Sequence, residues 1–430
     1  MRNWLWALLL IVLLVLATGA MPNQQEASDP PPPWAYGFLA PPGPSEGAAP
    51  AALMTSSAPL DDSTPMHLAG SSLAFTAAQI RGDFGPADWY PGDHPPMPGI
   101  VAHGRKPGIR ACSRCHYANG KGRPENAPIA GLPQSYFVQT MSDFKTGARK
   151  SADARKANTN EMIGIAKALT DEEVKAAAEY FSSMKWTPWI TVVETETVPK
   201  TRISVGMFLP REGNEKEPIG QRIIEMPEDA EAAEVLRDPR SGFIAYAPVG
   251  SVKKGEELVM RGAAGKTTAC AVCHGGDLQG LGPVPGISGR SPSYVVRQLY
   301  DMQKGSRRGQ WSELMKPVVA QLSNGDLLAV SAYLASRGVA AVPASASLVE
   351  QGQVRFRAYG CFECHGANGQ GTDQAPDLIT TRLTEAEIAV FLQKPSPDAR
   401  VKGMPSIPAT SPDLQALVAY VVSLKHGNDK

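Results

Sequence analysis

The sequence predicts a mainly α-helical chain of three tandem modules, with a β-rich connector between the first and second modules. A short motif, C-x-x-C-H, occurs three times, at residues 112–116, 270–274 and 361–365. Each copy is followed by a Gly-rich loop, a Pro, a helical stretch, an isolated Met and a final amphipathic helix, which indicates an internal repeat. Residues 191–250 are instead rich in β-branched residues between turn residues, a pattern typical of short strands.

The final helix of each module has a recognisable start. Thr170-Asp-Glu-Glu173 is a capping box, the second helix begins near Ser323, and Ser411-Pro412 combines an N-cap with Pro at the first helical position. The intervals from the motif His to the isolated Met are 46, 41 and 39 residues, and those from this Met to a Tyr of the last helix are 18, 18 and 16. This agreement predicts one small helical unit built three times.

The modules differ at their starts. An amphipathic stretch precedes the cysteines in the second and third modules, at 253–261 and 348–359. The first module has a proline-rich approach at 94–98, which cannot be a continuous helix. Its helix is therefore expected further back, at 75–80.

The expected domain boundaries follow from these shifts in composition. We expect a signal peptide or N-terminal anchor, a Pro/Ala-rich linker, a first module, the β-rich connector, a second module and a third module, at 1–20, 21–74, 75–190, 191–250, 251–340 and 341–430. Within the linker, the apolar island 34–38 is expected to dock on the body of the protein. Strands are expected in and just before the connector, at 190–198, 203–205, 222–225 and 243–246. The connector could clamp two modules together or present a docking surface.

The N-terminus and the charge balance limit location and partners. Arg2 precedes 14 apolar residues, 4–17, a length typical of a signal-peptide core and short for a membrane span. The modules are therefore expected outside the cytoplasm, in the periplasm, with membrane contact only through an uncleaved N-terminus. Lys+Arg and Asp+Glu number 42 each, so no overall field favours a nucleic-acid partner.

Each C-x-x-C-H motif is the attachment signature of a c-type haem. Two cysteines three positions apart share one face of a helical turn, where both thiols can bond to the two haem vinyl groups. A zinc site needs four ligands and each motif supplies at most three, while a redox dithiol needs no adjacent His. We therefore predict three covalently bound haem c groups, attached through Cys112, Cys115, Cys270, Cys273, Cys361 and Cys364, with His116, His274 and His365 as iron ligands.

The three motifs, the later Met residues and the last-helix Tyr residues resemble the class I c-type cytochromes. The third module is the most similar, with Ala375-Pro-Asp-Leu378 and Gly403-Met-Pro405. The resemblance implies helical haem modules of the cytochrome c kind. It implies that Met162, Met315 and Met404 are the second iron ligands. It also implies that the carbonyl groups of Pro128, Pro285 and Pro376 accept the N–H of the ligand imidazoles.

Other residues compete for the ligand positions. Met141 and Met302 occupy equivalent places in the first two modules, and an isolated Met more often fills a core. His94 and His103 precede the first motif, where a solvated loop is the usual interpretation. His67 and His426 carry no signal of their own.

A His/Met ligand pair fills both axial positions and leaves no site for a substrate on the iron. The expected function is therefore periplasmic electron transfer between a dehydrogenase or quinol-linked donor and a downstream acceptor, with redox proteins as partners: a periplasmic dehydrogenase, an oxidase or a small cytochrome. The architecture is similar to that of triheme cytochrome subunits of periplasmic dehydrogenases. The alternative is a multihaem enzyme, a peroxidase or a sulfur-compound oxidoreductase, with one haem that lacks a Met ligand; the first module is the one to suspect.

Overall fold

The computed structural model describes residues 30–41, 63–213, 215–337, 347–358, 361–366, 369–373, 375–402, 404, 406–407, 409 and 411–426. The expected signal peptide or anchor, 1–20, lies outside these residues, as does much of the expected linker. Within the described part of the chain, no helix combines the length and the apolar character needed to cross a bilayer.

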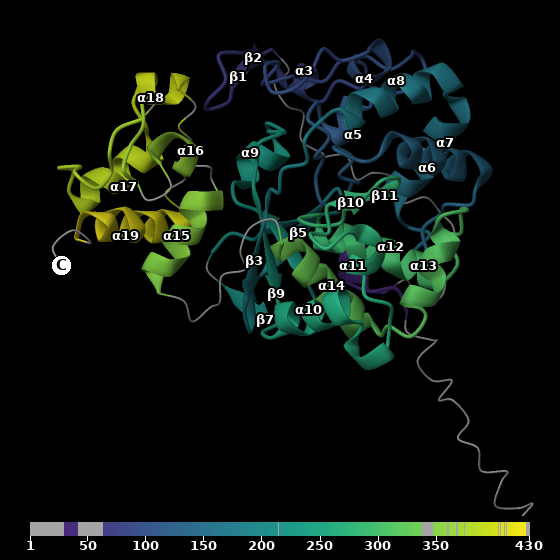
Figure 1. Ribbon diagram of the computed structural model, residues 1–430. Helices are drawn as coiled ribbons and strands as arrows, with labels where there is room; N and C mark the ends of the chain where they lie inside the picture. The colour runs from purple at the N-terminus through teal and green to yellow at the C-terminus, as the bar shows by residue number, and fades with distance from the viewer. Residues whose placement is uncertain are drawn as a thin grey trace, which may run out of the picture. The chain divides into compact units, whose positions relative to one another are not determined.

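The first cysteine motif lies among three longer helices, α6, α7 and α8 (Figure 1), which span Gln134–Thr146, Ala157–Ala168 and Asp171–Ser182. The start of α8 is the expected capping box, because the Thr170 side chain accepts a hydrogen bond from the backbone N–H of Glu173. The motif occupies α5, Ser113–His116. Between residue 63 and this motif the helices are short, α3 (Ala77–Ile80) and α4 (Gly99–Ala102), as the proline-rich approach predicts.

The second and third cysteine motifs each follow a long helix that packs against the last helix of the same repeat (Figure 1). The pairs are α10 (Ser251–Arg261) with α14 (Asn324–Ser336), and α15 (Leu348–Ala358) with α19 (Pro412–His426). Glycine allows the close approach in both pairs. A Cβ atom at Gly255 would lie 2.6 Å from the Cβ of Tyr333, and one at Gly352 would lie 2.5 Å from the Cβ of Tyr420. The two crossings are therefore built in the same way.

The remaining elements of these two repeats vary in length. In the second repeat they are η2 (Ala263–Gly265), α11 (Ala271–His274), β10 (Gly280–Leu281), β11 (Val284–Pro285), α12 (Pro292–Gln303) and α13 (Ser312–Val319). In the third they are α16 (Cys361–His365), α17 (Glu385–Gln393) and α18 (Pro397–Val401).

The connector forms strands, as predicted, but their limits differ. The strands are β3 (Ile190–Glu194), β4 (Thr197–Pro199), β5 (Thr201–Ser204), β6 (Met207–Pro210), β7 (Lys216–Pro218), β8 (Ile224–Pro227) and β9 (Phe243–Ala247), with the short helix α9 (Ala230–Glu234) before β9. The single strand predicted at 190–198 is wrong, because the Thr195 side chain accepts the N–H of Thr197 and turns the chain there. The strand predicted at 203–205 ends at Ser204, since Val205 has a positive φ of 51°.

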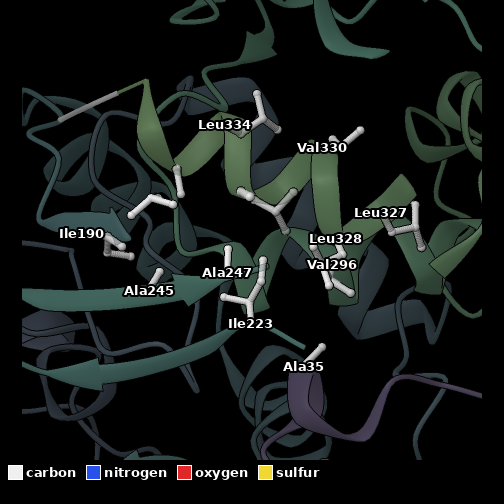
Figure 2. Close-up of a cluster of buried hydrophobic side chains, with 14 of the residues drawn as sticks. Ala35, Ile190, Ile223, Ala245, Ala247, Val296, Leu327, Leu328, Val330 and Leu334 are labelled. Atoms are coloured by element: carbon white, nitrogen blue, oxygen red, sulfur yellow. The ribbon is translucent and has the colours of Figure 1, made fainter. Parts of the chain in front are cut away.

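Three of these strands form the main sheet of the connector, in the order β3-β9-β8. β3 runs parallel to β9 and β8 runs antiparallel to it, whereas β4 pairs with β7 and β5 with β6. One buried cluster contains residues of this sheet, of α12 and of α14, and Figure 2 shows Ile190 and Ala245 in it with Leu334 and Val296. The connector and the second repeat therefore share one hydrophobic core.

The predicted docking of the apolar island is confirmed. It forms α2, Pro33–Tyr36, and Trp34, Ala35 and Tyr36 are buried in the same cluster, where Figure 2 shows Ala35. The Tyr36 hydroxyl donates to Asp301 of α12 at 2.8 Å. Further along, β1 (Met66–His67) pairs with β2 (Ala74–Phe75) in a small hairpin.

The connector contacts the first repeat as well as the second. Asn119 donates to the Pro239 carbonyl oxygen at 2.7 Å, and Trp89 donates to that of Leu236 at 2.7 Å. On the other side, the buried carboxylate of Glu225 accepts hydrogen bonds from Ser291 and Ser293, at the start of α12. These contacts agree with the clamp interpretation of residues 191–250.

Candidate haem-binding sites

Each cysteine motif forms a single helical turn. The backbone N–H of His116 donates to the Cys112 carbonyl oxygen at 3.0 Å, and that of His274 donates to the Cys270 carbonyl oxygen at 2.9 Å. In the third repeat, α16 runs from Cys361 to His365. This turn gives the two thiols of a motif a common side, as the spacing of three predicts.

The three motif histidines share one further contact, with a backbone carbonyl group eleven residues later. The Nδ1 atoms of His116, His274 and His365 lie 2.8, 2.8 and 2.9 Å from the carbonyl oxygens of Ala127, Pro285 and Pro376. An Nδ1–H that donates to this oxygen leaves the lone pair of Nε2 free to bind a metal. Each imidazole is therefore held in the tautomer that an iron ligand requires.

The predicted carbonyl acceptors of Pro285 and Pro376 are confirmed, and that of Pro128 is wrong. Pro128 stands twelve residues after His116, whereas the acceptor in every repeat stands eleven residues after its His. Ala127 therefore takes that place. The Pro128 carbonyl group points elsewhere, and accepts a hydrogen bond from the Arg290 guanidinium at 2.8 Å.

Burial sets the protonation of these groups. It lowers the pKa of His116 and of His274, which favours the neutral imidazole that binds metal. It also raises the pKa of the thiols, to about 12 for Cys112, about 11 for Cys270 and about 12 for Cys361. The reactive cysteine of a redox dithiol has a lowered pKa, so these sites do not have the character of a thiol-exchange centre.

A cavity that is partly open to solvent adjoins the first motif. Its walls are mainly apolar, and its lining includes Cys112, Cys115 and His116 together with both Met162 and Met141. Phenylalanine side chains from α6 and α8 and aliphatic side chains complete the walls: Phe137, Phe144, Phe181, Ile129, Leu132, Ile165, Leu169 and Val174. A mainly apolar cavity lined by both cysteines and the histidine of the motif suits a porphyrin.

One side of this cavity is polar and comes partly from the second repeat. Arg149 is buried and donates to Gln298 of α12 at 2.7 Å and to the Tyr294 hydroxyl at 3.2 Å. Arg307, also buried, is not a lining residue itself but donates to two that are, to Gln298 at 2.9 Å and to the Tyr136 hydroxyl at 2.7 Å. Within the described residues, neither guanidinium has a carboxylate ion-pair partner. Such cations suit the carboxylate groups of a porphyrin, and sequence reasoning missed them because no local pattern marks them.

The structure distinguishes some of the Met residues that could be iron ligands from those that fill the core. Met162 lies half-buried on α7, in the same cavity as His116, but Met141 of α6 lines that cavity too. Met315 of α13 is half-buried against the hydrophobic cluster that Cys270 also contacts. Met404 is half-buried after α18, and its N–H donates to the Ala399 carbonyl group. Met302 is buried in the core on α12, as a core-filling residue would be.

The two histidines that precede the first motif, His94 and His103, have other interactions than those of the motif histidines. His94 is engaged at both ring nitrogens, since Nε2 pairs with Asp88 at 3.1 Å and Nδ1 lies 2.9 Å from the Pro95 carbonyl oxygen. The hydrogen bond that the ring donates to the Asp88 carboxylate is the main cause of the raised pKa of His94, which favours the protonated form and opposes metal binding. His103 caps the C-terminal end of α4.

Two family profiles match the chain, described as "Cytochrome c" at residues 101–185 and "Cytochrome C oxidase, cbb3-type, subunit III" at residues 347–421. Cytochrome c-554(548) of Halomonas halodenitrificans is 37% identical over 73 residues, which are 88% of that protein and 17% of this chain. The chain belongs to the cytochrome c family. Other relatives align with a longer part of this chain, at lower identity. "Thiosulfate dehydrogenase electron acceptor" of Thiomonas intermedia is 28% identical over 235 residues, 54% of this chain and 80% of that protein. Cytochrome c4 of Stutzerimonas stutzeri is 25% identical over 235 residues, 53% of this chain and 84% of that protein.

Family membership agrees with the geometry of the sites. The histidine turns, the paired cysteines and the apolar cavity are what a haem-binding, electron-transferring cytochrome c requires. Helices dominate the fold around each motif, as the sequence predicts.

Proposed function

We propose that this cytochrome c carries three covalently bound haem c groups, one for each C-x-x-C-H motif, and transfers electrons without bond chemistry of its own. The observation that supports this most directly is the repeated imidazole geometry. In all three motifs a carbonyl group eleven residues later holds Nδ1, so that Nε2 can bind iron. The cysteine pairs at 112 and 115, 270 and 273, and 361 and 364 would form the thioether bonds.

Met162, Met315 and Met404 are the proposed second iron ligands. Haem c, when bound, would supply a one-electron couple, and a His/Met ligand pair would raise its potential and leave the iron no site for a substrate. The chain's own residues then have three tasks. The motif histidines and methionines would hold the metal, the apolar walls would exclude water, and Arg149, which lines the cavity, would neutralise a porphyrin carboxylate at the first site.

The proposed domain plan is that of the sequence, three modules with a connector clamping the first two. The proposed location is the periplasm, since c-type haem attachment follows export, and membrane contact would be through the N-terminus alone. The name of one relative, a thiosulfate dehydrogenase electron acceptor, favours a sulfur-compound dehydrogenase as the electron donor. The match of residues 347–421 to an oxidase subunit favours an acceptor on the oxidase side, reached through the third module.

The test is to count haems and identify their ligands in the purified full-length holoprotein. The pyridine haemochrome assay should give three haems per chain, and a spectroscopic redox titration should find three low-spin centres. A count below three, or a high-spin centre in the unmodified protein that binds carbon monoxide readily, would refute the carrier function and favour the multihaem enzyme.

A matched pair of variants tests the ligand of the first site. Met162→Ala should convert one centre of the three to high spin, because one axial ligand is lost. Met141→Ala, which removes a Met from the same cavity, should leave all three low spin. The opposite pattern would assign the ligand to Met141.

A further inference from the structure

The loops that hold the first two ligand histidines are joined by a single arginine. The carbonyl groups that follow the two acceptors along the chain belong to Pro128 and Gly286. Arg290 binds both: Nη1 donates to the Pro128 oxygen at 2.8 Å and Nε donates to the Gly286 oxygen at 3.1 Å. A third bond runs from Nη2 to the Ala130 oxygen at 3.2 Å. One guanidinium thus reaches the loop of the first repeat and the loop of the second.

These contacts connect the two imidazoles through a short series of bonds. The His116 ring contacts Ala127, whose neighbour Pro128 is bound by Arg290, and Arg290 binds Gly286, whose neighbour Pro285 contacts His274. The outer partners of a ligand histidine orient its ring and tune its basicity. In both sites, Arg290 therefore binds the residue that directly follows the carbonyl group accepting from the ligand histidine.

The arginine is deeply buried. It is 4% exposed, and its guanidinium lies 4.1 Å from the ring centroid of Trp186. The Trp186 indole donates to the Ser288 carbonyl oxygen at 2.9 Å, and a Cβ on Gly131 or on Gly289 would lie within 3.3 Å of an atom of this Trp. Trp186 and Arg290 thus lie together between the two loops.

The charge of Arg290 has no direct counter-ion in the described residues, because its hydrogen-bond partners are backbone carbonyl groups. Burial lowers its pKa to about 10, so it stays protonated at neutral pH. A buried cation with neutral partners is expensive in stability. The third repeat has Thr381 at the corresponding place, five residues after the carbonyl group that accepts from its His. The link therefore belongs to the first two sites only.

We propose that Arg290 is a positioning residue that sets the reduction potentials of the first two haem centres together. Its fork fixes the two histidine loops relative to one another, and its positive charge favours the reduced form of both irons. This inference rests on the proposed function, since it requires iron at His116 and His274. At an effective dielectric constant of about 20, a unit charge on the order of 10 Å from a redox centre changes its reduction equilibrium roughly tenfold.

The experiment is a redox titration of the full-length holoprotein and of Arg290→Gln, with centres assigned by variants that lack one cysteine motif. Arg290→Gln should lower the reduction equilibrium constants of the first two centres about tenfold each, equivalent to 59 mV for a one-electron couple. The third centre should not move and serves as an internal reference. Arg222→Gln is the matched control, because Arg222 also donates to two backbone carbonyl groups, but within the connector. It should move none of the three.

Other patterns would overturn the proposal. A shift in only one centre, in none, or equally in all three would show that Arg290 does not tune the pair. Arg290→Lys keeps the charge and should leave the reduction equilibrium constants of the first two centres within about threefold of the unmodified values. A tenfold fall in this variant would also contradict the proposal. This test remains available if Arg290→Gln does not fold. The haem count is measured first. Fewer than three haems in the unmodified protein refutes the proposed function, whereas three haems with unmoved potentials refutes only the role of Arg290.

Discussion

The glycine at the crossing of α10 and α14 allows a sharp test of how the second module is built. Gly255→Ala adds one methyl group where α10 meets α14. That Cβ would overlap the Ala329 carbonyl oxygen and lie 2.6 Å from the Cβ of Tyr333. The oxygen and the Tyr Cβ both belong to the α14 scaffold, so neither can swing away as a long side chain does. The two helices must separate for the methyl group to fit.

Two effects of opposite sign decide the outcome. Ala is better than Gly inside a helix by about 1 kcal/mol. Overpacking a tight contact costs about 1–3 kcal/mol, and more where the backbone must move. We therefore expect Gly255→Ala to destabilise the α10–α14 pair by about 1–2 kcal/mol. The shift would also disturb haem attachment, because the Cys270 N–H is bound to the Val259 carbonyl group of α10 at 2.8 Å.

Hydrogen exchange of the amides in the two helices, followed by mass spectrometry, measures this local stability. Gly164→Ala is the control, since Gly164 lies within α7 and a Cβ there meets nothing within 4 Å. It should slow exchange in its own helix, because only the helix propensity changes. Gly352→Ala should repeat the Gly255 result in the third module, where the Cβ would meet Tyr420 at 2.5 Å. Equal or greater protection in Gly255→Ala would refute the close-contact reasoning.

Three further changes have clear expected outcomes. Burial raises the pKa of Glu225 to about 7, from 4.5. The folded state therefore binds the proton of this carboxyl group more tightly than the unfolded state does. The resulting stabilisation of the fold is complete below pH 4.5 and is lost as the pH rises through 7. Glu225→Gln should therefore be more stable than the unmodified protein at pH 8, by up to about 3 kcal/mol, and similar to it at pH 4.5, as urea unfolding at the two pH values would show. Burial alone would raise the pKa of Asp326, but hydrogen bonds from Lys266 and Lys254 lower it below the ordinary value. Its contribution is present above the unfolded-state pKa and disappears in acid, so Asp326→Asn should lower the unfolding midpoint at pH 7 and much less at pH 2. Tyr36→Phe leaves the buried Asp301 without its hydroxyl donor and should cost about 1–3 kcal/mol; an unchanged midpoint in thermal unfolding would argue that α2 is only loosely docked.

The parts of the fold that depend on neighbouring residues were predictable. The capping box at Thr170 and the buried island at Trp34 can be recognised within a few positions. The strands at 190–198 and 203–205 had the right composition but the wrong limits, because one side-chain turn at Thr195 and one positive φ at Val205 end them. Composition favours strands, but it does not give their partners, and β3 pairs with β9 across some fifty residues.

At the haem-binding sites, too, local features were predictable from the sequence and long-range contacts were not. Comparison of the three repeats would have found Ala127, because the interval of eleven residues recurs, but a search for the nearest Pro leads to Pro128 instead. No interval in the sequence points to Arg290 or to Arg149, whose partners in the other repeat stand more than a hundred residues away. Their role depends on two modules meeting, which no local pattern encodes.

By itself, the sequence determined the chemistry that covalent bonds and single helical turns control: three cysteine pairs, each with its histidine, and the repeated helices that enclose them. Only the tertiary structure decided which carbonyl group holds each imidazole, that the connector shares a core with the second module, and that one buried guanidinium spans two histidine loops. The physical reason is the separation along the chain between the groups that interact. Turns and caps are satisfied within a few residues, whereas a buried cation takes its hydrogen-bond partners from whatever chain the fold brings beside it.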